Sequence, residues 1–268
     1  MRSIFLSPHL DDAALSCGGT IHRLGQAGAE VVVVTVMAGQ PDLSTLSDLA
    51  KRLHKLMGNA ERVVDGRRAE DAAAMKILGA RRELLSFLDG PYRRSTAGGW
   101  RYPTVPSLFA PVHDDDRDQL TDIVDAIAAC TNPTGDRYLA PLGTGGHVDH
   151  ELINLAGHEL ARRGAVVWFY EDYPYAEPGY GHNRAHGAPV ALDDVLAAPR
   201  HRHLVAQIQA LSETDIDAKV AGICAYESQL DMLFGNRASV AARIVTFAGS
   251  RGVAGLAERF WRPPSPTT

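Results

Sequence analysis

The chain contains little cysteine: only Cys17, Cys130 and Cys224 occur among 268 residues, and no two of them form a C-x-x-C pair. Such a small, odd and scattered set argues against a disulfide framework. Long apolar runs are also missing, and the N-terminal MRSIFLSPHL is too short in its apolar part for a signal peptide or a membrane span. We therefore expect a cytoplasmic protein that has no membrane span.

The sequence has no excess of basic residues. Lys and Arg number 27 against 32 Asp and Glu, which gives a net charge of −5. Nucleic-acid binding needs a basic field, so we expect no nucleic-acid partner and a small-molecule ligand instead. Hydrophobic residues make up 45% of the chain, a normal globular share. The length suits one core, and we predict a single domain over 1–268 with a short disordered tail from about residue 263.

The first part of the chain predicts a strand, a helix and a second strand. Residues 4–6 form a short apolar run that stops at Ser-Pro, and residues 13–28 carry apolar side chains at roughly helical spacing. Residues 30–37 contain VVVVTV, a β-branched run without alternation, which is typical of a parallel strand covered on both faces. The order predicts a βαβ unit with a right-handed crossover.

The rest of the chain continues the alternation. The pattern predicts strands at 84–88, 137–141 and 165–170, and helices at 67–78, 118–130, 149–163 and about 200–234. Long loops, the first with some helix, are expected at 40–66, 91–117 and 171–189. The fold class is therefore α/β: one Rossmann-like doubly wound domain, with a mainly parallel sheet and helices on both faces. In such sheets ligands bind beyond the carboxyl ends of the strands.

A dense polar motif, Ser7-Pro8-His9-Leu10-Asp11-Asp12, follows the first predicted strand directly. Two adjacent carboxylates repel each other unless a cation or a proton lies between them. A structural alternative is that one Asp caps the following helix.

A second motif, Gly145-Gly146-His147-Val148-Asp149-His150, follows the strand predicted at 137–141. Two histidines three residues apart at a helix start lie on nearly the same face. The structural alternative is a Gly-rich turn before a helix capped by Asp149. Together the two motifs indicate a catalytic zinc site more strongly than either does alone. Such sites use three His or carboxylate ligands and keep one position open. One carboxylate and one His would remain for proton transfer and charge stabilisation.

With these two motifs the chain resembles the PIG-L/LmbE family of zinc-dependent deacetylases. That family includes N-acetylglucosaminyl-phosphatidylinositol deacetylases, deacetylases of mycothiol and bacillithiol synthesis, and antibiotic-sugar deacetylases. Three further segments match family motifs in the right order: Arg67-Arg68-Ala69-Glu70 with Leu78-Gly79, Leu88-Asp89-Gly90, and Lys219 with Tyr226-Glu227-Ser228-Gln229. The resemblance covers most of the chain.

The resemblance implies a role for each matching residue. The zinc ligands would be His9, Asp12 and His150, and another divalent metal such as Fe²⁺ is compatible with this set. Asp11 would be the general base for a zinc-bound water, and His147 would stabilise the oxyanion or protonate the leaving amine. Arg67 and Asp89 would hold substrate hydroxyl or anionic groups. The implied reaction removes an N-acetyl or other N-acyl group from a small sugar-containing substrate.

The chain departs from the family pattern at three positions. Leu10 replaces the usual Pro of H-P-D-D, and Ala13 replaces an acidic residue. Gly145 stands where some members carry a Tyr that assists the oxyanion, so that help must come from elsewhere or be absent.

The same motifs also fit other functions. An amidase of thiol-sugar conjugates, or a sugar-binding protein of the same fold without catalysis, remains an alternative. A nucleotide-binding enzyme is disfavoured because no GxGxxG follows the first strand. The three long loops would select the substrate, and a homo-oligomer is compatible with the sequence. We expect a solvated turn at 114–116, a basic helix face at His201 and His203, and solvated loop histidines at His182 and His186.

Overall fold

The strands assemble into one seven-stranded sheet in the order β3-β2-β1-β4-β5-β7-β6. We describe it from a computed structural model, which covers residues 1–58, 63–180 and 190–264. The strand bounds are β1 Ser3–Ser7, β2 Val31–Thr35, β3 Arg81–Leu84, β4 Arg137–Pro141, β5 Val166–Tyr170, β6 Val205–Ala210 and β7 Ala257–Arg262. The first five strands in the order are parallel, and β7 runs antiparallel to both β5 and β6.

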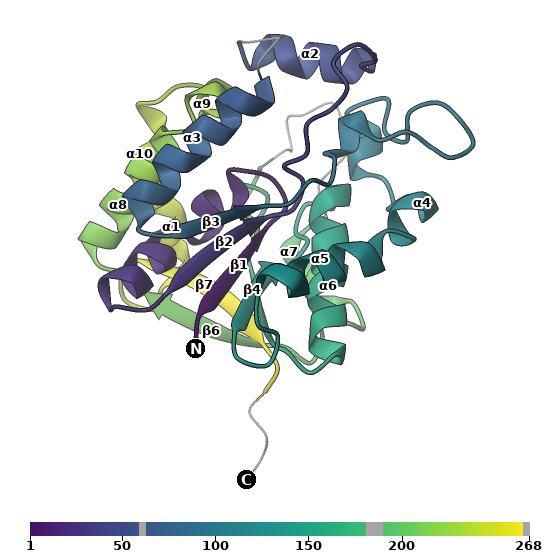
Figure 1. Ribbon diagram of the computed structural model, residues 1–268. Coiled ribbons are helices and arrows are strands. Elements are labelled where there is room, and N and C mark those ends of the chain that lie inside the picture. The colour runs from purple at the N-terminus through teal and green to yellow at the C-terminus, as the bar shows by residue number, and fades with distance from the viewer. Residues whose placement is uncertain (59–62, 181–189, 265–268) are drawn as a thin grey trace.

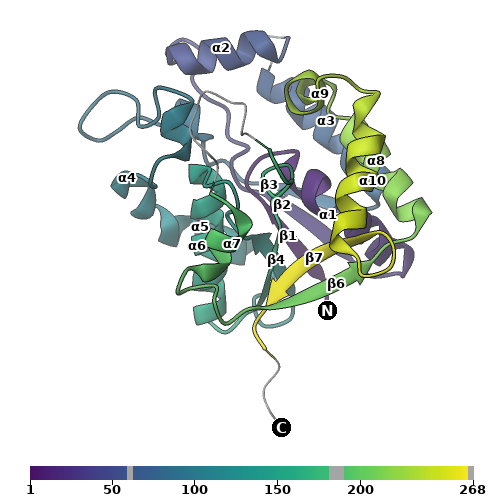
Figure 2. The same cartoon turned by 180° about the vertical axis from the view of Figure 1, so that it is seen from behind.

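Helices cover both faces of the sheet (Figures 1 and 2). Successive side chains of a strand point to opposite faces. Accordingly Phe5 of β1 packs into the cluster that includes α1 and α3 residues, whereas Ile4 and Leu6 pack with residues of α5 and α6. The helix bounds are α1 Asp12–Gln26, α2 Asp48–Leu56, α3 Val63–Leu78, α4 Asp114–Arg117, α5 Leu120–Cys130, α6 Val148–Arg162, α7 Leu192–Ala197, α8 Glu213–Cys224, α9 Glu227–Phe234 and α10 Ser239–Arg251. The predicted doubly wound α/β fold is confirmed.

The order of the strands places the two sequence motifs side by side. β1 lies between β2 and β4, so the chain winds outward in both directions from the β1–β4 pair. The carboxyl ends of these two strands form a switch point, where open α/β sheets bind ligands. One motif follows β1 and the other follows β4.

Several predicted elements differ from the structure. The third strand ends at Leu84, so the strand predicted at 84–88 is wrong beyond its first residue; only an isolated bridge joins Ser86 to Met37. The region predicted as helical over about 200–234 contains β6 before α8 and α9. Within the described residues β6 pairs with β7 alone, more than 40 residues further along the chain. Its local sequence therefore gives no sign of this partner.

Two predictions about exposed polar residues are also wrong. Asp116 is fully buried rather than part of a solvated turn, and it pairs with Arg93 and Arg101. His201 lies in a turn, is 1% exposed, and forms hydrogen bonds with Asn154 and the Val195 carbonyl, so it belongs to no basic helix face. The predictions for His182, His186 and residues 265–268 of the tail lie outside the described residues. In the part of the chain that is described, no helix has the length and apolarity to cross a membrane.

Candidate active site

The turn after β1 presents His9, Asp11 and Asp12 at the switch point. Ser7 fixes this turn: its hydroxyl donates to the His9 carbonyl at 2.6 Å and accepts from the Ala13 N–H at 3.0 Å. The His9 N–H donates to Asp12 Oδ2 at 2.8 Å. These hydrogen bonds hold His9, Asp11 and Asp12 at the start of α1.

The turn after β4 and the first turn of α6 present His147 and His150. Three glycines with positive φ, namely Gly143, Gly145 and Gly146, lead the chain from β4 into α6. His147 is the N-cap of α6, and its Nδ1 accepts from the Asp149 N–H at 3.3 Å. The cap is therefore His147 rather than Asp149.

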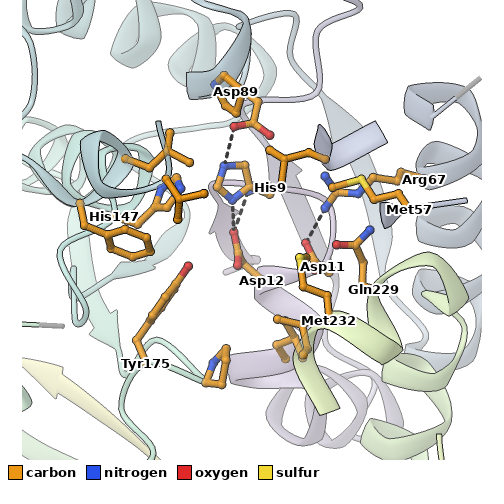
Figure 3. A pocket seen from close by; sticks show the side chains of 18 of the residues that line it. His9, Asp11, Asp12, Met57, Arg67, Asp89, His147, Tyr175, Gln229 and Met232 are labelled. Carbon is orange, nitrogen blue, oxygen red and sulfur yellow. Dashed lines mark hydrogen bonds and ion pairs between the residues drawn. The ribbon is translucent and has the colours of Figure 1, made fainter. Parts of the chain in front are cut away.

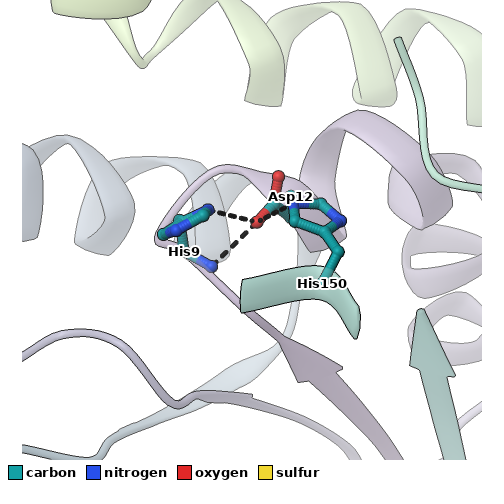
Figure 4. A group of neighbouring side chains, drawn as sticks. All are labelled: His9, Asp12 and His150. Atoms are coloured by element: carbon teal, nitrogen blue, oxygen red, sulfur yellow. Dashed lines mark hydrogen bonds and ion pairs between the residues drawn. The ribbon is translucent and has the colours of Figure 1, made fainter. Parts of the chain in front are cut away.

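Three predicted ligands converge on one point (Figure 4). Asp12 Oδ2 lies 3.0 Å from His9 Nδ1 and 3.3 Å from His150 Nε2. One potential ligand atom from each residue lies within 4.8 Å of the others. His150 Nε2 is buried, and although it lies 3.3 Å from Asp12 Oδ2 it makes no hydrogen bond of good geometry, which is costly unless something else occupies that direction. The donor set and this unsatisfied nitrogen fit a divalent metal ion.

Two buried carboxylates contact His9 and His150 at the ring nitrogen that faces away from Asp12. Asp172 Oδ1 lies 2.7 Å from His150 Nδ1, and its other oxygen accepts the N–H groups of Gly143 and Thr144. Asp149 Oδ2 lies 3.0 Å from His9 Nε2, and Asp149 also pairs with Arg93. Carboxylates in this position commonly fix the ring orientation of metal-binding histidines.

Sequence reasoning missed the role of both carboxylates. Asp149 lies within H-V-D-H, and Asp172 lies in the loop predicted at 171–189, but neither position by itself indicates a histidine partner. A second potential ligand group, His9, His147 and Asp149, also lies within 4.8 Å. Asp149 already pairs with Arg93 and accepts the Gly90 N–H, so the His9, Asp12 and His150 group fits a cation better.

The electrostatics of the cluster favour a bound cation. Burial by itself lowers the pKa of His9, but Asp89 and Asp12 outweigh it and raise that pKa to about 10. Burial likewise opposes charge on His150, and Asp12 with Asp172 raises its pKa to about 9. Burial also works against ionisation of Asp12, yet the two histidines hold its pKa well below the ordinary value. The carboxylates thus create a strongly negative local field.

Asp11 has different surroundings from its neighbour Asp12. Its Oδ1 accepts from Arg67 Nη2 at 2.8 Å, and it makes no contact with His9 or His150 of hydrogen-bond length among the described residues (Figure 3). Burial raises the pKa of Asp11, and the positive charge of Arg67 offsets part of that rise. A carboxylate beside the ligand cluster but bonded elsewhere suits proton transfer.

His147 faces the same cavity as a neutral imidazole. Burial, together with the nearby His9 and His150, holds its pKa well below the ordinary value. Because Nδ1 accepts from a backbone N–H, the neutral ring carries its proton on Nε2. His147 therefore offers an N–H donor.

The cavity at this site has a volume of about 210 Å³. Its polar lining residues include His9, Asp11, Asp12, Arg67, Asp89, His147 and Gln229, and two tyrosines, Tyr175 and Tyr180, also line it. Asp89 Oδ1 lies 3.4 Å from His9 Nε2. Six of the seven predicted site residues therefore line one cavity, and the seventh, His150, contacts Asp12 of that lining at 3.3 Å.

The glycine at position 145 leaves room for an aromatic ring from elsewhere. A Cβ at Gly145 would lie 2.5 Å from Cγ of Tyr175, so that ring occupies the space a side chain would need. Tyr175 lines the cavity and its ring lies edge-on to His150, with centroids 5.2 Å apart.

The fold and the site together define an α/β enzyme with a divalent-metal donor set at the sheet's switch point. A family profile, PIG-L, described as GlcNAc-PI de-N-acetylase, matches residues 4–161. This match covers more than half of the chain, which therefore belongs to the PIG-L family. The prediction of an enzyme that hydrolyses amides is confirmed by this membership together with the relatives below.

Relatives and solved structures agree with this assignment. A 2'-N-acetylparomamine deacetylase of Niallia circulans is 29% identical over 96% of this chain and 89% of its own. A crystal structure of a deacetylase from teicoplanin biosynthesis aligns with a TM-score of 0.79 and 28% identity, covering 97% of both chains. A structure described as the zinc-inhibited form of teicoplanin deacetylase aligns with a TM-score of 0.78 and 27% identity, again over 97% of both.

Proposed function

We propose that the protein is a metal-dependent N-deacetylase that removes the acetyl group from an N-acetylated amino sugar. The observation that carries this proposal is the convergence of His9, Asp12 and the unsatisfied Nε2 of His150 beside a separate carboxylate, Asp11. The relatives named above, which act on N-acetylparomamine or in teicoplanin biosynthesis, support an amino-sugar substrate.

His9, Asp12 and His150 would hold the metal. A divalent ion there supplies Lewis-acid chemistry, lowering the pKa of a water and polarising a carbonyl. Two His and one carboxylate suit Zn²⁺, and they also accept Fe²⁺.

The surrounding residues would carry the proton transfers. Asp11 accepts a proton from the attacking water, while Arg67 keeps the carboxylate oriented. The Nε2–H of His147 donates to the carbonyl oxygen as negative charge develops on it. Protonated Asp11 then returns its proton to the amide nitrogen as the C–N bond breaks, which gives acetic acid and a free amine. Arg67 and Asp89 would bind the sugar hydroxyls.

The proposal is tested by amine release from N-acetylglucosaminides, N-acetyl pseudodisaccharides and thiol-sugar conjugates. We expect release from an N-acetyl amino sugar, its loss on chelation, and its return when one equivalent of metal is added. Preference for the thiol conjugates would identify the alternative amidase. Sugar binding without amine release from any substrate would identify a non-catalytic binding protein.

We predict that wild-type protein retains one divalent ion per chain and that His9→Ala loses it. The imidazole supplies one of only three protein ligands, so its removal leaves an incomplete site. Mass spectrometry of the purified proteins measures the metal. The matched control is His22→Ala, because His22 also pairs with a carboxylate, Asp215, at 2.9 Å but lies elsewhere. Equal metal in wild type and His9→Ala would contradict the ligand assignment.

Asp172→Asn should weaken metal binding about 10- to 100-fold, the usual effect of losing a carboxylate behind a histidine ligand. The physical reason is the 2.7 Å contact to His150 Nδ1, which fixes the ring with Nε2 toward Asp12. Competition with a chelating dye measures the affinity. Asp215→Asn, which disturbs the equivalent pair with His22, should leave the affinity unchanged.

Asp89→Ala should lower kcat/KM on an N-acetyl amino sugar about 10- to 100-fold, the effect expected for loss of a hydrogen bond to a charged group. Its side chain is 21% exposed and lines the cavity beside His9. Metal content is measured in parallel, because Asp89 also contacts His9. An unchanged kcat/KM would show that Asp89 only stabilises the local turn.

A further inference from the structure

A buried guanidinium, that of Arg93, lies between two buried carboxylates close to the proposed metal site. Arg93 is 5% exposed, and Asp116 and Asp149 are both fully buried. Nη2 of Arg93 donates to Asp149 Oδ1, and its Nη1 lies 3.0 Å from Asp116 Oδ2. The other oxygen of Asp149, Oδ2, lies 3.0 Å from His9 Nε2. Asp149 therefore connects Arg93 to a proposed metal ligand.

A second set of contacts fixes Arg93 in this position. The Tyr102 hydroxyl donates to Asp116 Oδ2 at 2.6 Å, and the Arg93 guanidinium lies over the Tyr102 ring, 5.2 Å from its centroid. Arg101 pairs with the other oxygen of Asp116, Oδ1. Because Asp116 is itself held by two partners, it gives Arg93 a fixed position from which to reach Asp149.

Gly90 leaves the space that the contact with Asp149 needs. A Cβ at Gly90 would lie 3.2 Å from Arg93 Nη2 and 2.9 Å from Cδ2 of Leu108. The Gly90 N–H donates to Asp149 Oδ2 at 3.1 Å. A backbone N–H and a side chain of one short segment thus bind the same carboxylate, which limits its orientation.

This arrangement decides which nitrogen of His9 is available to a cation. Arg93 binds Oδ1 of Asp149, which leaves Oδ2 for His9. A carboxylate paired with a guanidinium only accepts hydrogen bonds, so His9 Nε2 is the donor in that contact. The lone pair of His9 Nδ1 is then left on the side of Asp12, whose Oδ2 lies 3.0 Å away.

We propose that Arg93 is a positioning residue of the metal site, which holds Asp149 against His9 and thereby strengthens metal binding. The inference rests on the proposed function for the metal itself. The segment 90–117 supplies Arg93 and also lines the cavity, through Leu108 and Phe109. It would therefore contribute to metal affinity as well as to the shape of the cavity.

Metal affinity tests the inference apart from catalysis. Competition with a chelating dye for Zn²⁺ compares wild type with Arg93→Gln, for which we expect about 10-fold weaker binding, since a partner behind a histidine ligand contributes at least this much. Arg93→Lys should recover part of the loss, because the ammonium keeps the charge but does not pair with both carboxylates as a guanidinium does. Equal affinity in wild type and Arg93→Gln would overturn the inference and leave the proposed function standing. Wild-type protein that binds no divalent ion would overturn both.

A double-mutant cycle shows whether Arg93 acts through Asp149. Asp149→Asn alone should weaken Zn²⁺ binding about 10- to 100-fold. Adding Arg93→Gln to it should change the affinity by less than about twofold, because the contact that Arg93 supports is already lost. A further 10-fold loss, as for roughly independent effects, would overturn the inference. Tighter binding in Arg93→Gln alone would also overturn it, because Arg93 would then compete with the metal for Asp149.

The matched control is Arg101→Gln, which removes the other guanidinium from Asp116 and leaves the contact between Arg93 and Asp149 in place. The side chains of Arg93 and Arg101 are 6% and 8% exposed, so both variants should lower Tm to a similar extent. We expect Arg101→Gln to keep the wild-type metal affinity. A loss as large as that of Arg93→Gln would show that any damage to the segment weakens the site, and would overturn the inference. If Arg93→Gln does not fold, Arg93→Lys and Arg101→Lys replace the pair, with a loss of affinity again expected only in the first.

Discussion

Replacing Asp11 by Asn should leave the metal in place and lower turnover by roughly 10²- to 10⁴-fold, the usual contribution of a positioned general base. Asparagine keeps the shape of the side chain and its acceptor oxygen for Arg67, but it cannot take a proton from water. Asp11 is 7% exposed and bonded to Arg67 at 2.8 Å, apart from the ligand cluster. The variant therefore removes basicity with little change to the three proposed ligands.

Asp12→Asn should instead lose metal, where Asp11→Asn keeps it. Asp12 Oδ2 is shared between His9 Nδ1 and His150 Nε2, and a neutral amide is a weaker ligand than a carboxylate. We expect metal content to fall and activity to return in part when metal is added in excess. Metal content and turnover are measured side by side, with the exposed Asp48→Asn as control.

The two carboxylates thus give a sharp test of the mechanism. Loss of metal in Asp11→Asn with retention in Asp12→Asn would reverse their roles. Full metal and full activity in Asp11→Asn would show that another group takes the proton, and the proposed mechanism would be wrong.

The convergence of the two motifs could be predicted from the sequence because each motif directly follows a predicted parallel strand. The β-branched run at Val31–Thr35 and the short apolar run before Ser7 identify adjacent parallel strands from local sequence alone. Because the carboxyl ends of parallel strands meet at one edge of the sheet, the His9 and His150 segments could be expected to converge.

Contacts between side chains far apart in the sequence could not be predicted from local sequence patterns. Asp172 contacts His150 because β4 and β5 are neighbours in the sheet. Asp116 is buried because Arg93 and Arg101, from the loop region before it, pair with its carboxylate. An acidic side chain is usually solvated unless a partner from elsewhere pairs with it. The same limit applies to β6 and β7, whose pairing depends on long-range contacts rather than on local pattern.

A buried ion pair between residues far apart in the sequence joins α1, α8 and β7. Lys219 is 1% exposed, and its Nζ donates to Glu258 Oε1 at 2.7 Å and to the Ser16 carbonyl at 3.2 Å. Glu258 also accepts the N–H groups of Gly19 and Thr20. Every charged end of this pair is therefore satisfied inside the protein.

Lys219→Met should lower the free energy of unfolding by about 3–5 kcal/mol, because it leaves the Glu258 carboxylate buried without its cation. Adding Glu258→Gln should recover part of this loss, since the neutral amide removes the uncompensated charge and can still accept from one N–H. Urea denaturation of all variants in the same metal state measures the free energies. The matched control is Lys51→Met, which breaks the exposed 3.5 Å pair with Asp48 and should cost less than about 1 kcal/mol. If Lys219→Met is no more destabilising than Lys51→Met, the pair does not hold these three elements together.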